Sequence, residues 1–91
     1  MSFLDGDKMK ILGFDIAMSL WDDLFSGIEA DGNAHPASPE YLVWMLDQIT
    51  EDAAVMDVDK MHRWIGYIQG VAITINLTSL DKERERVRKL I

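Results

Sequence analysis

The sequence predicts an all-α protein, a small bundle of three to four helices within a single domain that spans residues 1–91. Three observations support this fold class. Apolar residues recur at spacings of three and four along most of the chain, which is the period of an amphipathic helix. Capping residues and a proline stand before the periodic segments. Neither a repeat nor a linker divides the 91 residues, a length that suits one domain and is too short for two.

The first predicted helix runs from about Asp7 to Phe25, after a flexible N-terminal tail over residues 1–6. Gly13 lowers the stability of such a helix by about 1 kcal/mol relative to alanine, so we expect it to mark close packing by a neighbouring element. The predicted stripe consists of large apolar side chains three or four residues apart, namely Ile11, Phe14, Met18, Trp21 and Phe25, widened by Leu20, Leu24 and Ile28.

The segment 26–38 is predicted to be a loop, because glycines, an asparagine and a proline interrupt the apolar period. A second helix follows over about Pro39–Ala54. Ser38 provides a capping hydroxyl, Pro39 suits the first helical position and Glu40 places an acid in the first turn. The predicted buried residues of this helix are Leu42, Met45, Leu46 and Ile49.

A third helix is predicted over about Val58–Ile75, with Asp57 or Asp59 as its cap. Residues 71–78 also alternate between apolar and polar side chains and are rich in β-branched residues, which predicts a short strand instead. We favour the helix, because a lone strand would have no partner strand. The stripe of this helix consists of Met61, Ile65, Ile68, Ala72 and Ile75.

The last predicted helix begins at Thr78 or Ser79, either of which can cap it, and runs to the C-terminus. One side of it carries Leu80, Arg84, Val87, Leu90 and Ile91. Opposite charges three residues apart are each expected to contribute roughly a few tenths of a kcal/mol on a surface helix. These pairs are Asp81–Arg84, Lys82–Glu85, Glu83–Arg86 and Glu85–Arg88.

The charge of the chain is distributed unevenly. The net charge is −7, with 13 acidic and 2 basic residues in 1–59 (−11) and 3 acidic and 7 basic residues in 60–91 (+4). This acidity opposes docking on bare nucleic acid or on an anionic membrane. The longest apolar-rich run, over residues 64–77, is too short to span a bilayer.

The absence of cysteine excludes disulfides, a thiol nucleophile and zinc–thiolate sites. A small secreted domain often needs disulfides, so this composition predicts a cytoplasmic protein. The N-terminal residues show no basic region leading into an apolar stretch, so no targeting segment is expected.

No catalytic, cofactor-binding or metal site is predicted. The histidines His35 and His62 lie in different segments, without a ligand at metal-binding spacing. The carboxylate clusters lack the alternating oxygen donors and the distal glutamate of a calcium loop. No serine has a nucleophile motif, and no glycines form a phosphate-binding loop. The sequence therefore argues against an enzyme.

Two surfaces are candidates for binding. The first is acidic and belongs to the first two helices, with Asp22, Asp23, Asp47, Glu51 and Asp52. Such a surface can occupy a site built for nucleic acid. The second is a helix-pairing or dimer face formed by Gly66 and Gly70 together with Trp64 and Tyr67, since the two glycines share one face of a helix. For these glycines the favoured interpretation is tight packing inside the monomer, and the helix pair across a dimer interface is the alternative.

The basic last helix suggests a third surface. Nucleic-acid binding through this helix is opposed by the interleaved acids Asp81, Glu83 and Glu85, which weaken its field. The favoured interpretation is a surface helix whose charges pair with one another, or one that docks against an acidic surface, which a second copy of the chain could supply. The basic residues concerned are Lys82, Arg84, Arg86, Arg88 and Lys89.

Residues 59–71, DKMHRWIGYIQGV, followed by residues 81–88, DKERERVR, resemble a segment of small proteins from bacteriophages and prophages. In those proteins an aromatic helix with a GxxQG pattern precedes a charged helix. The resemblance covers residues 59–88, about a third of the chain. It implies a phage or prophage protein that acts inside a bacterium, and it assigns no functional residue.

Together these observations predict a non-enzymatic protein-interaction module that modulates a host or phage protein, without cofactor or metal. One alternative is a structural homodimer or assembly component. Another is a nucleic-acid accessory protein that uses the basic last helix.

Overall fold

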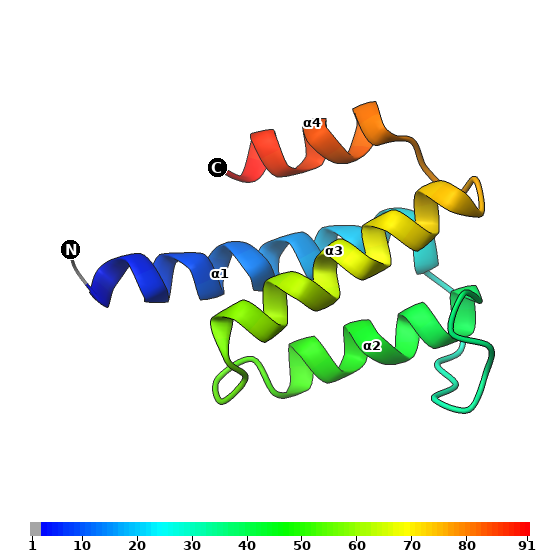
Figure 1. Ribbon diagram of the computed structural model, residues 1–91, viewed down its shortest axis with the longest axis horizontal. Helices are drawn as coiled ribbons and strands as arrows, with labels where there is room; N and C mark the ends of the chain where they lie inside the picture. The colour runs from blue at the N-terminus through cyan, green and yellow to red at the C-terminus, as the bar shows by residue number, and fades with distance from the viewer. Residues whose placement is uncertain (1–2) are drawn as a thin grey trace.

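The computed structural model describes residues 3–91, and the side chains from Asp7 onward. Four α-helices make up most of this range: α1 (Phe3–Leu20), α2 (Pro39–Glu51), α3 (Val58–Thr74) and α4 (Leu80–Leu90). A short π-helical segment, η1 (Trp21–Phe25), continues α1 directly. The described residues contain no strand, and the helices pack into one small bundle (Figure 1). The predicted all-α fold class is confirmed.

The first helix begins earlier than predicted and buries a different face. It starts at Phe3, so residues 3–6 are helical rather than a tail, while residues 1–2 lie outside the described residues. Two members of the predicted stripe, Ile11 and Met18, are 61% and 44% exposed. The buried face instead holds residues 13, 16, 17 and 20, which include a glycine and an alanine. Small side chains on this face let α3 approach closely.

The π-helical segment explains how the end of this helix stays buried. Its backbone follows the wider i→i+5 pattern, which shifts the face of the helix by part of a turn. Leu20 and Phe25, five residues apart, are both fully buried as a result. Residues 26–38 then connect η1 to α2 through turns.

The predicted caps are present at three helix starts. The Ser38 hydroxyl accepts a hydrogen bond from the Tyr41 N–H at 3.3 Å, with Pro39 at the first helical position. Asp57, not Asp59, caps α3 through the Lys60 N–H at 3.2 Å. Ser79, not Thr78, caps α4 through the Lys82 N–H, also at 3.2 Å. These caps satisfy backbone donors that have no partner within the helix.

The strand alternative for residues 71–78 is wrong, because α3 continues to Thr74 and closes in a Schellman motif. The Leu77 N–H donates to the Ala72 carbonyl at 2.9 Å, and the Asn76 N–H donates to the Ile73 carbonyl at 3.1 Å. Asn76 has φ 65°, the left-handed conformation that this motif requires and that asparagine tolerates. This turn sets the point from which α4 begins.

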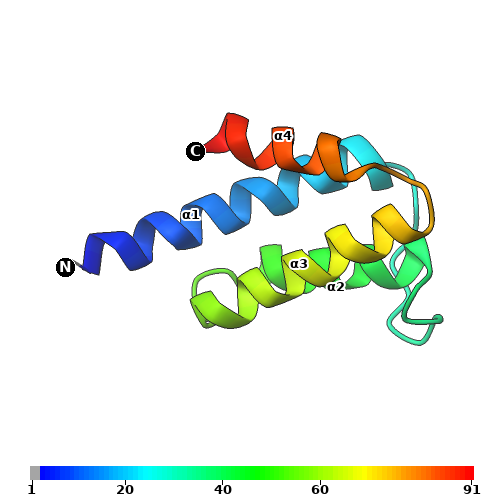
Figure 2. The same ribbon diagram turned by 45° about the horizontal axis from the view of Figure 1, so that its top comes forward.

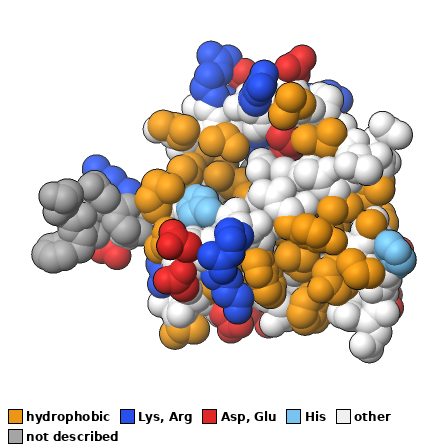
Figure 3. Space-filling view, viewed as in Figure 1, with side chains coloured by type: hydrophobic (Ala, Val, Ile, Leu, Met, Phe, Trp, Pro, Cys, Tyr) orange, Lys and Arg blue, Asp and Glu red, His pale blue; other side chains and the backbone are white. Residues whose placement is uncertain are grey.

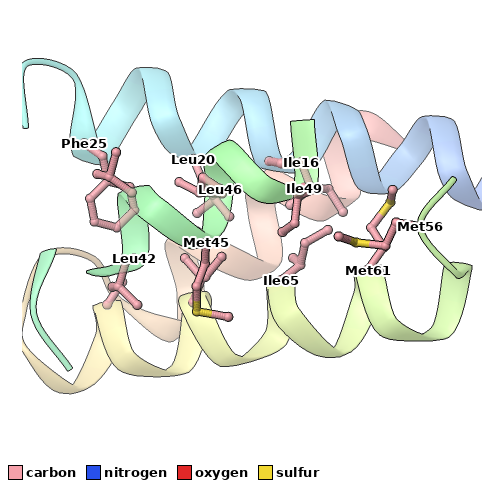
Figure 4. Packing of buried hydrophobic residues seen from close by; sticks show 14 residues of the cluster. Ile16, Leu20, Phe25, Leu42, Met45, Leu46, Ile49, Met56, Met61 and Ile65 are labelled. Atoms are coloured by element: carbon pink, nitrogen blue, oxygen red, sulfur yellow. The ribbon is translucent and has the colours of Figure 1, made fainter. Parts of the chain in front are cut away.

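The core lies between α1, α2 and α3, whose buried side chains point toward one another (Figure 4). Its largest fully buried members come from all three helices and η1: Leu20, Phe25, Leu42, Leu46, Ile49, Met61 and Ile68. Gly13 is the point of closest approach between α1 and α3. A methyl carbon added there would lie 2.5 Å from Met61 Sδ and 3.2 Å from His62 Nε2. The close packing predicted at Gly13 is confirmed.

The same substitution is expected to have opposite effects at two helical glycines. Gly13→Ala should lower the free energy of unfolding by on the order of 1 kcal/mol, because overpacking against the buried Met61 outweighs the gain in helix propensity. Gly66→Ala should raise it by about 0.5–1 kcal/mol, because a methyl group there meets nothing within 4 Å. Urea unfolding of both variants tests this. If the free energy of unfolding changed in the same direction in both, the packing described would be contradicted.

Candidate functional site

The last helix is docked through a buried ion pair. Glu83 and Arg86 are only 4% and 9% exposed. The guanidinium donates from Nε to Glu83 Oε1 at 3.0 Å and from Nη2 to Oε2 at 3.1 Å, a bidentate arrangement. The sequence predicts this pair to lie on the surface, and that prediction is wrong. Arg86 is therefore also not part of the basic surface predicted for the last helix.

Four further side chains complete the network. Arg86 Nη1 donates to Ser19 Oγ of α1 at 2.7 Å and to Asp23 Oδ2 of η1 at 2.8 Å. Glu83 accepts hydrogen bonds from Gln69 Nε2 of α3 at 3.1 Å and from Thr78 Oγ1 at 2.8 Å. Within the described part of the chain, no buried side-chain nitrogen or oxygen lacks a hydrogen-bond partner. The network thus joins α1, η1, α3 and α4.

The network reverses the effect of burial on both ionisable groups. Burial by itself raises the pKa of Glu83. The hydrogen bonds from Arg86, Thr78 and Gln69 and the charge of Arg86 lower it by more than burial raises it, so the net shift is downward. Burial likewise lowers the pKa of Arg86, whereas its bonds to Glu83 and Asp23 produce a net upward shift. Both groups are held in their charged forms.

Because α4 turns its ion pair inward, most of its apolar side chains face outward, and only Val87 is partly buried against the core. Leu80 is 53% exposed, Leu90 37% and Ile91 87%. The helix packs along α1, while its backbone contacts with α3 are sparse (Figures 1 and 2). In Figure 3, hydrophobic side chains are exposed below the basic side chains at the upper edge, where α4 lies. The docking of α4 therefore leaves the space beside α3 open.

That space is a groove of about 560 Å³, which we call the α3–α4 groove. Two stripes at helical spacing face each other across it. The stripe on α3 consists of Gly66, Gln69, Gly70 and Ile73, and the stripe on α4 consists of Leu80, Glu83, Arg84, Val87, Arg88 and the following Ile91.

The two glycines of the groove do not pack against anything. A methyl carbon added at Gly66 or Gly70 would meet no atom within 4 Å. Tight packing of these glycines inside the monomer, the interpretation that the sequence favoured, is therefore wrong. Without side chains, they leave the backbone of α3 accessible at the floor of the groove.

Trp64 and Tyr67, predicted to share a face with these glycines, lie on another side of α3. They line a separate shallow groove with Pro36, Tyr41 and Met45. The Trp64 ring lies 6.4 Å from that of Trp44, and the Lys60 ammonium lies 5.0 Å above it. The Tyr67 hydroxyl donates to the Pro36 carbonyl at 2.9 Å and so attaches the loop to α3. These aromatic residues support the bundle.

The five acidic residues predicted to bind a partner do not act as one group. Asp23 is already bound to Arg86, although its side chain is 65% exposed. Asp47 is half-buried and lines a shallow groove between α1 and α2 with Met18, Trp21, Leu46 and Thr50. Asp22, Glu51 and Asp52 are exposed.

Both histidine rings are hydrogen-bonded to backbone groups. His62 Nε2 lies 2.8 Å from the Met9 carbonyl and links α3 to α1, and His35 Nδ1 accepts the Ala37 N–H at 3.0 Å. Among the described residues, no three histidine, cysteine or carboxylate side chains gather at a point where they could hold a metal ion. No helix in this range has the length and apolar character needed to cross a membrane.

Comparison with models of known protein families gives no match, and comparisons with curated proteins and with solved structures give no significant match either. A function for the α3–α4 groove therefore rests on the contacts and charges of the chain itself.

Removing one partner of the buried pair should destabilise the fold strongly. Arg86→Met leaves the Glu83 carboxylate buried without its cation and should lower the free energy of unfolding by about 3–5 kcal/mol. The double variant Glu83→Leu/Arg86→Met removes both charges and should recover at least half of that loss. Denaturant unfolding of the two variants tests this, and a double variant as unstable as the single one would contradict it.

The lowered pKa of Glu83 makes stability depend on acid pH. A carboxylate with a lowered pKa in the folded state contributes stability that is fully present above its ordinary value of 4.5 and is lost as pH falls through the lower value. Glu83→Gln should therefore lose less stability than the wild type between about pH 5 and pH 3. Chemical unfolding across this range measures the difference. Glu85 lies on the same helix with a more exposed side chain, so Glu85→Gln controls for the change in net charge. Identical stability profiles for the two variants would refute the prediction.

Proposed function

We propose that the chain is a cytoplasmic, non-enzymatic protein-interaction module that binds a helix of a partner protein in the α3–α4 groove. One observation carries this proposal: α4 is docked by its ion pair, so its apolar residues Leu80, Val87 and Ile91 line an open groove, and of these only Val87 also packs against the core. Together with the stripe of α3, they offer a ready-made site for a third helix.

The shape of the groove suits helix recognition. Amphipathic helices bind in apolar grooves through side chains at i, i+3, i+4 and i+7, and the two stripes of the groove have the same spacing. Gly66 and Gly70 present backbone without side chains, which lets a second helix approach closely. The groove walls are rigid helices, so a partner would bind a largely preformed site.

Three parts of the sequence interpretation remain predictions. The phage or prophage context is implied by residues 59–88 and would give the module a host or phage protein as its target. The acidic surface of the first two helices is the competing binding site, in which Asp47 lines the α1–α2 groove. The structural homodimer is the competing function, in which a second copy would fill the α3–α4 groove.

Filling the α3–α4 groove should abolish partner binding. In a tagged pull-down from a nuclease-treated bacterial lysate, Gly66→Leu/Gly70→Leu should lose the protein that the wild type retains in stoichiometric amount. The substitutions place side chains in open space, so the fold should persist by circular dichroism. Thr50→Leu, which fills the α1–α2 groove, is the matched control and should retain the partner.

The opposite pattern, loss with Thr50→Leu and retention with the glycine variant, would place the binding site on the acidic surface instead. Recovery of only the tagged chain and its untagged copies would favour self-assembly.

A further inference from the structure

We infer that the occupant of the α3–α4 groove is an acidic amphipathic helix of another protein, which binds Arg84 and Arg88 through two carboxylates one turn apart. The inference rests on the proposed function, because it names the chemistry of the partner for that same groove.

The groove carries a local positive charge. Arg84 and Arg88 both line it, and both are exposed. Its single carboxylate, Glu83, is buried and bound to Arg86, so it presents no free negative charge to a ligand. Arg84 belongs to none of the three ion pairs found among the described residues. Arg88 pairs with Glu85, but its side chain is 77% exposed.

Three other charged residues of α4 lie outside this groove. Lys82, Glu85 and Lys89 line a different groove, on the side of α4 that faces α1. The chain has a net charge of −7, yet most of this excess lies in residues 1–59. Since charges in physiological salt are screened beyond about 8 Å, a ligand in the groove is influenced mainly by nearby charges, which include the two arginines and the Glu85 carboxylate paired with Arg88.

The dimensions of the groove define the ligand further. The 11 residues of α4 extend for about 16 Å, or three helical turns. A helix of that length offers three apolar anchors at i, i+3 or i+4, and i+7 to Ile73, Leu80 and Val87. Arg84 and Arg88 lie one turn apart, so two carboxylates at i and i+4 of the ligand match their spacing. Guanidinium groups bind carboxylates in bidentate geometry, which favours such a pairing.

A second copy of the chain fits this groove less well. Docking through the same face would bring Arg84 and Arg88 of both copies together, with like charges opposed. Docking of the acidic helix α2 of a second copy would be a head-to-tail contact, which leaves a free groove and a free α2 at the ends of every assembly unless the copies close into a ring. A separate partner has neither problem.

Two synthetic helical peptides of roughly 18 residues serve as probes. They share one stripe of leucine and alanine and differ only in their flanks, which are glutamate in one and lysine in the other. Fluorescence anisotropy at physiological salt should show that the wild type binds the glutamate peptide about tenfold more tightly than the lysine peptide. Arg84→Glu/Arg88→Glu should reverse this preference, and Gly66→Leu/Gly70→Leu should abolish the binding of both peptides.

The matched control is Lys82→Glu/Lys89→Glu, which makes the same change in charge on the same helix outside the groove. It should retain the preference for the glutamate peptide. A control variant that also reverses the preference would show that net charge, not the groove, selects the ligand.

The remaining outcomes separate the two proposals. If the wild type bound both peptides with equal affinity and the glycine variant bound neither, the proposal of an acidic ligand would be overturned. The groove would remain a binding site. If the glycine variant still bound the peptides, or if the folded wild type bound neither of them, the proposal that the groove is the binding site would be overturned. Self-association in analytical ultracentrifugation that the glycine variant prevents would make a second copy the occupant.

Discussion

The buried pair of Glu83 and Arg86 determines how α4 is oriented, and the rest of the surface follows from that orientation. Burying two charges costs several kcal/mol of desolvation each unless the pair is well formed and further hydrogen bonds complete it. Here the guanidinium donates to Ser19 and Asp23, and the carboxylate accepts from Gln69 and Thr78. These four residues come from three separate parts of the chain. The network therefore accepts one orientation of α4, in which Leu80, Leu90 and Ile91 point outward and Val87 stays partly buried.

The orientation also depends on where α4 begins. The Schellman turn with Asn76 in the left-handed conformation ends α3, and the Ser79 cap starts α4 three residues later. Between them, Thr78 donates its hydroxyl to Glu83 and joins the connection to the network. A connection this short limits the positions open to α4, so the local turn and the distant ion pair act on the same helix. Neither would open the α3–α4 groove alone.

The sequence predicted the parts of this fold that depend on local chemistry. The cap at Ser38 and the close packing at Gly13 were predicted from residue type and position. For the other two caps the sequence left a choice, between Asp57 and Asp59 and between Thr78 and Ser79. The buried face of α1 could not be predicted in this way, because this helix is apolar on several sides and its contact with α3 decides between them. The position of α4 also depends on distant partners. Three pairs of the same spacing, Asp81–Arg84, Glu83–Arg86 and Glu85–Arg88, look equivalent in the sequence. Only the middle pair lies opposite Ser19, Asp23 and Gln69.

The glycines of α3 show why this surface is better explained by a partner than by the monomer. A glycine inside a helix lowers stability by about 1 kcal/mol relative to alanine. Gly13 offsets that cost by admitting Met61 and His62, whereas Gly66 and Gly70 face open space and offset nothing in the isolated chain. Leu80 and Ile91 of α4 add exposed apolar surface beside them. A helix bound in the groove would cover these apolar side chains and use the close approach that the glycines permit, so a single binding event accounts for both unfavourable features.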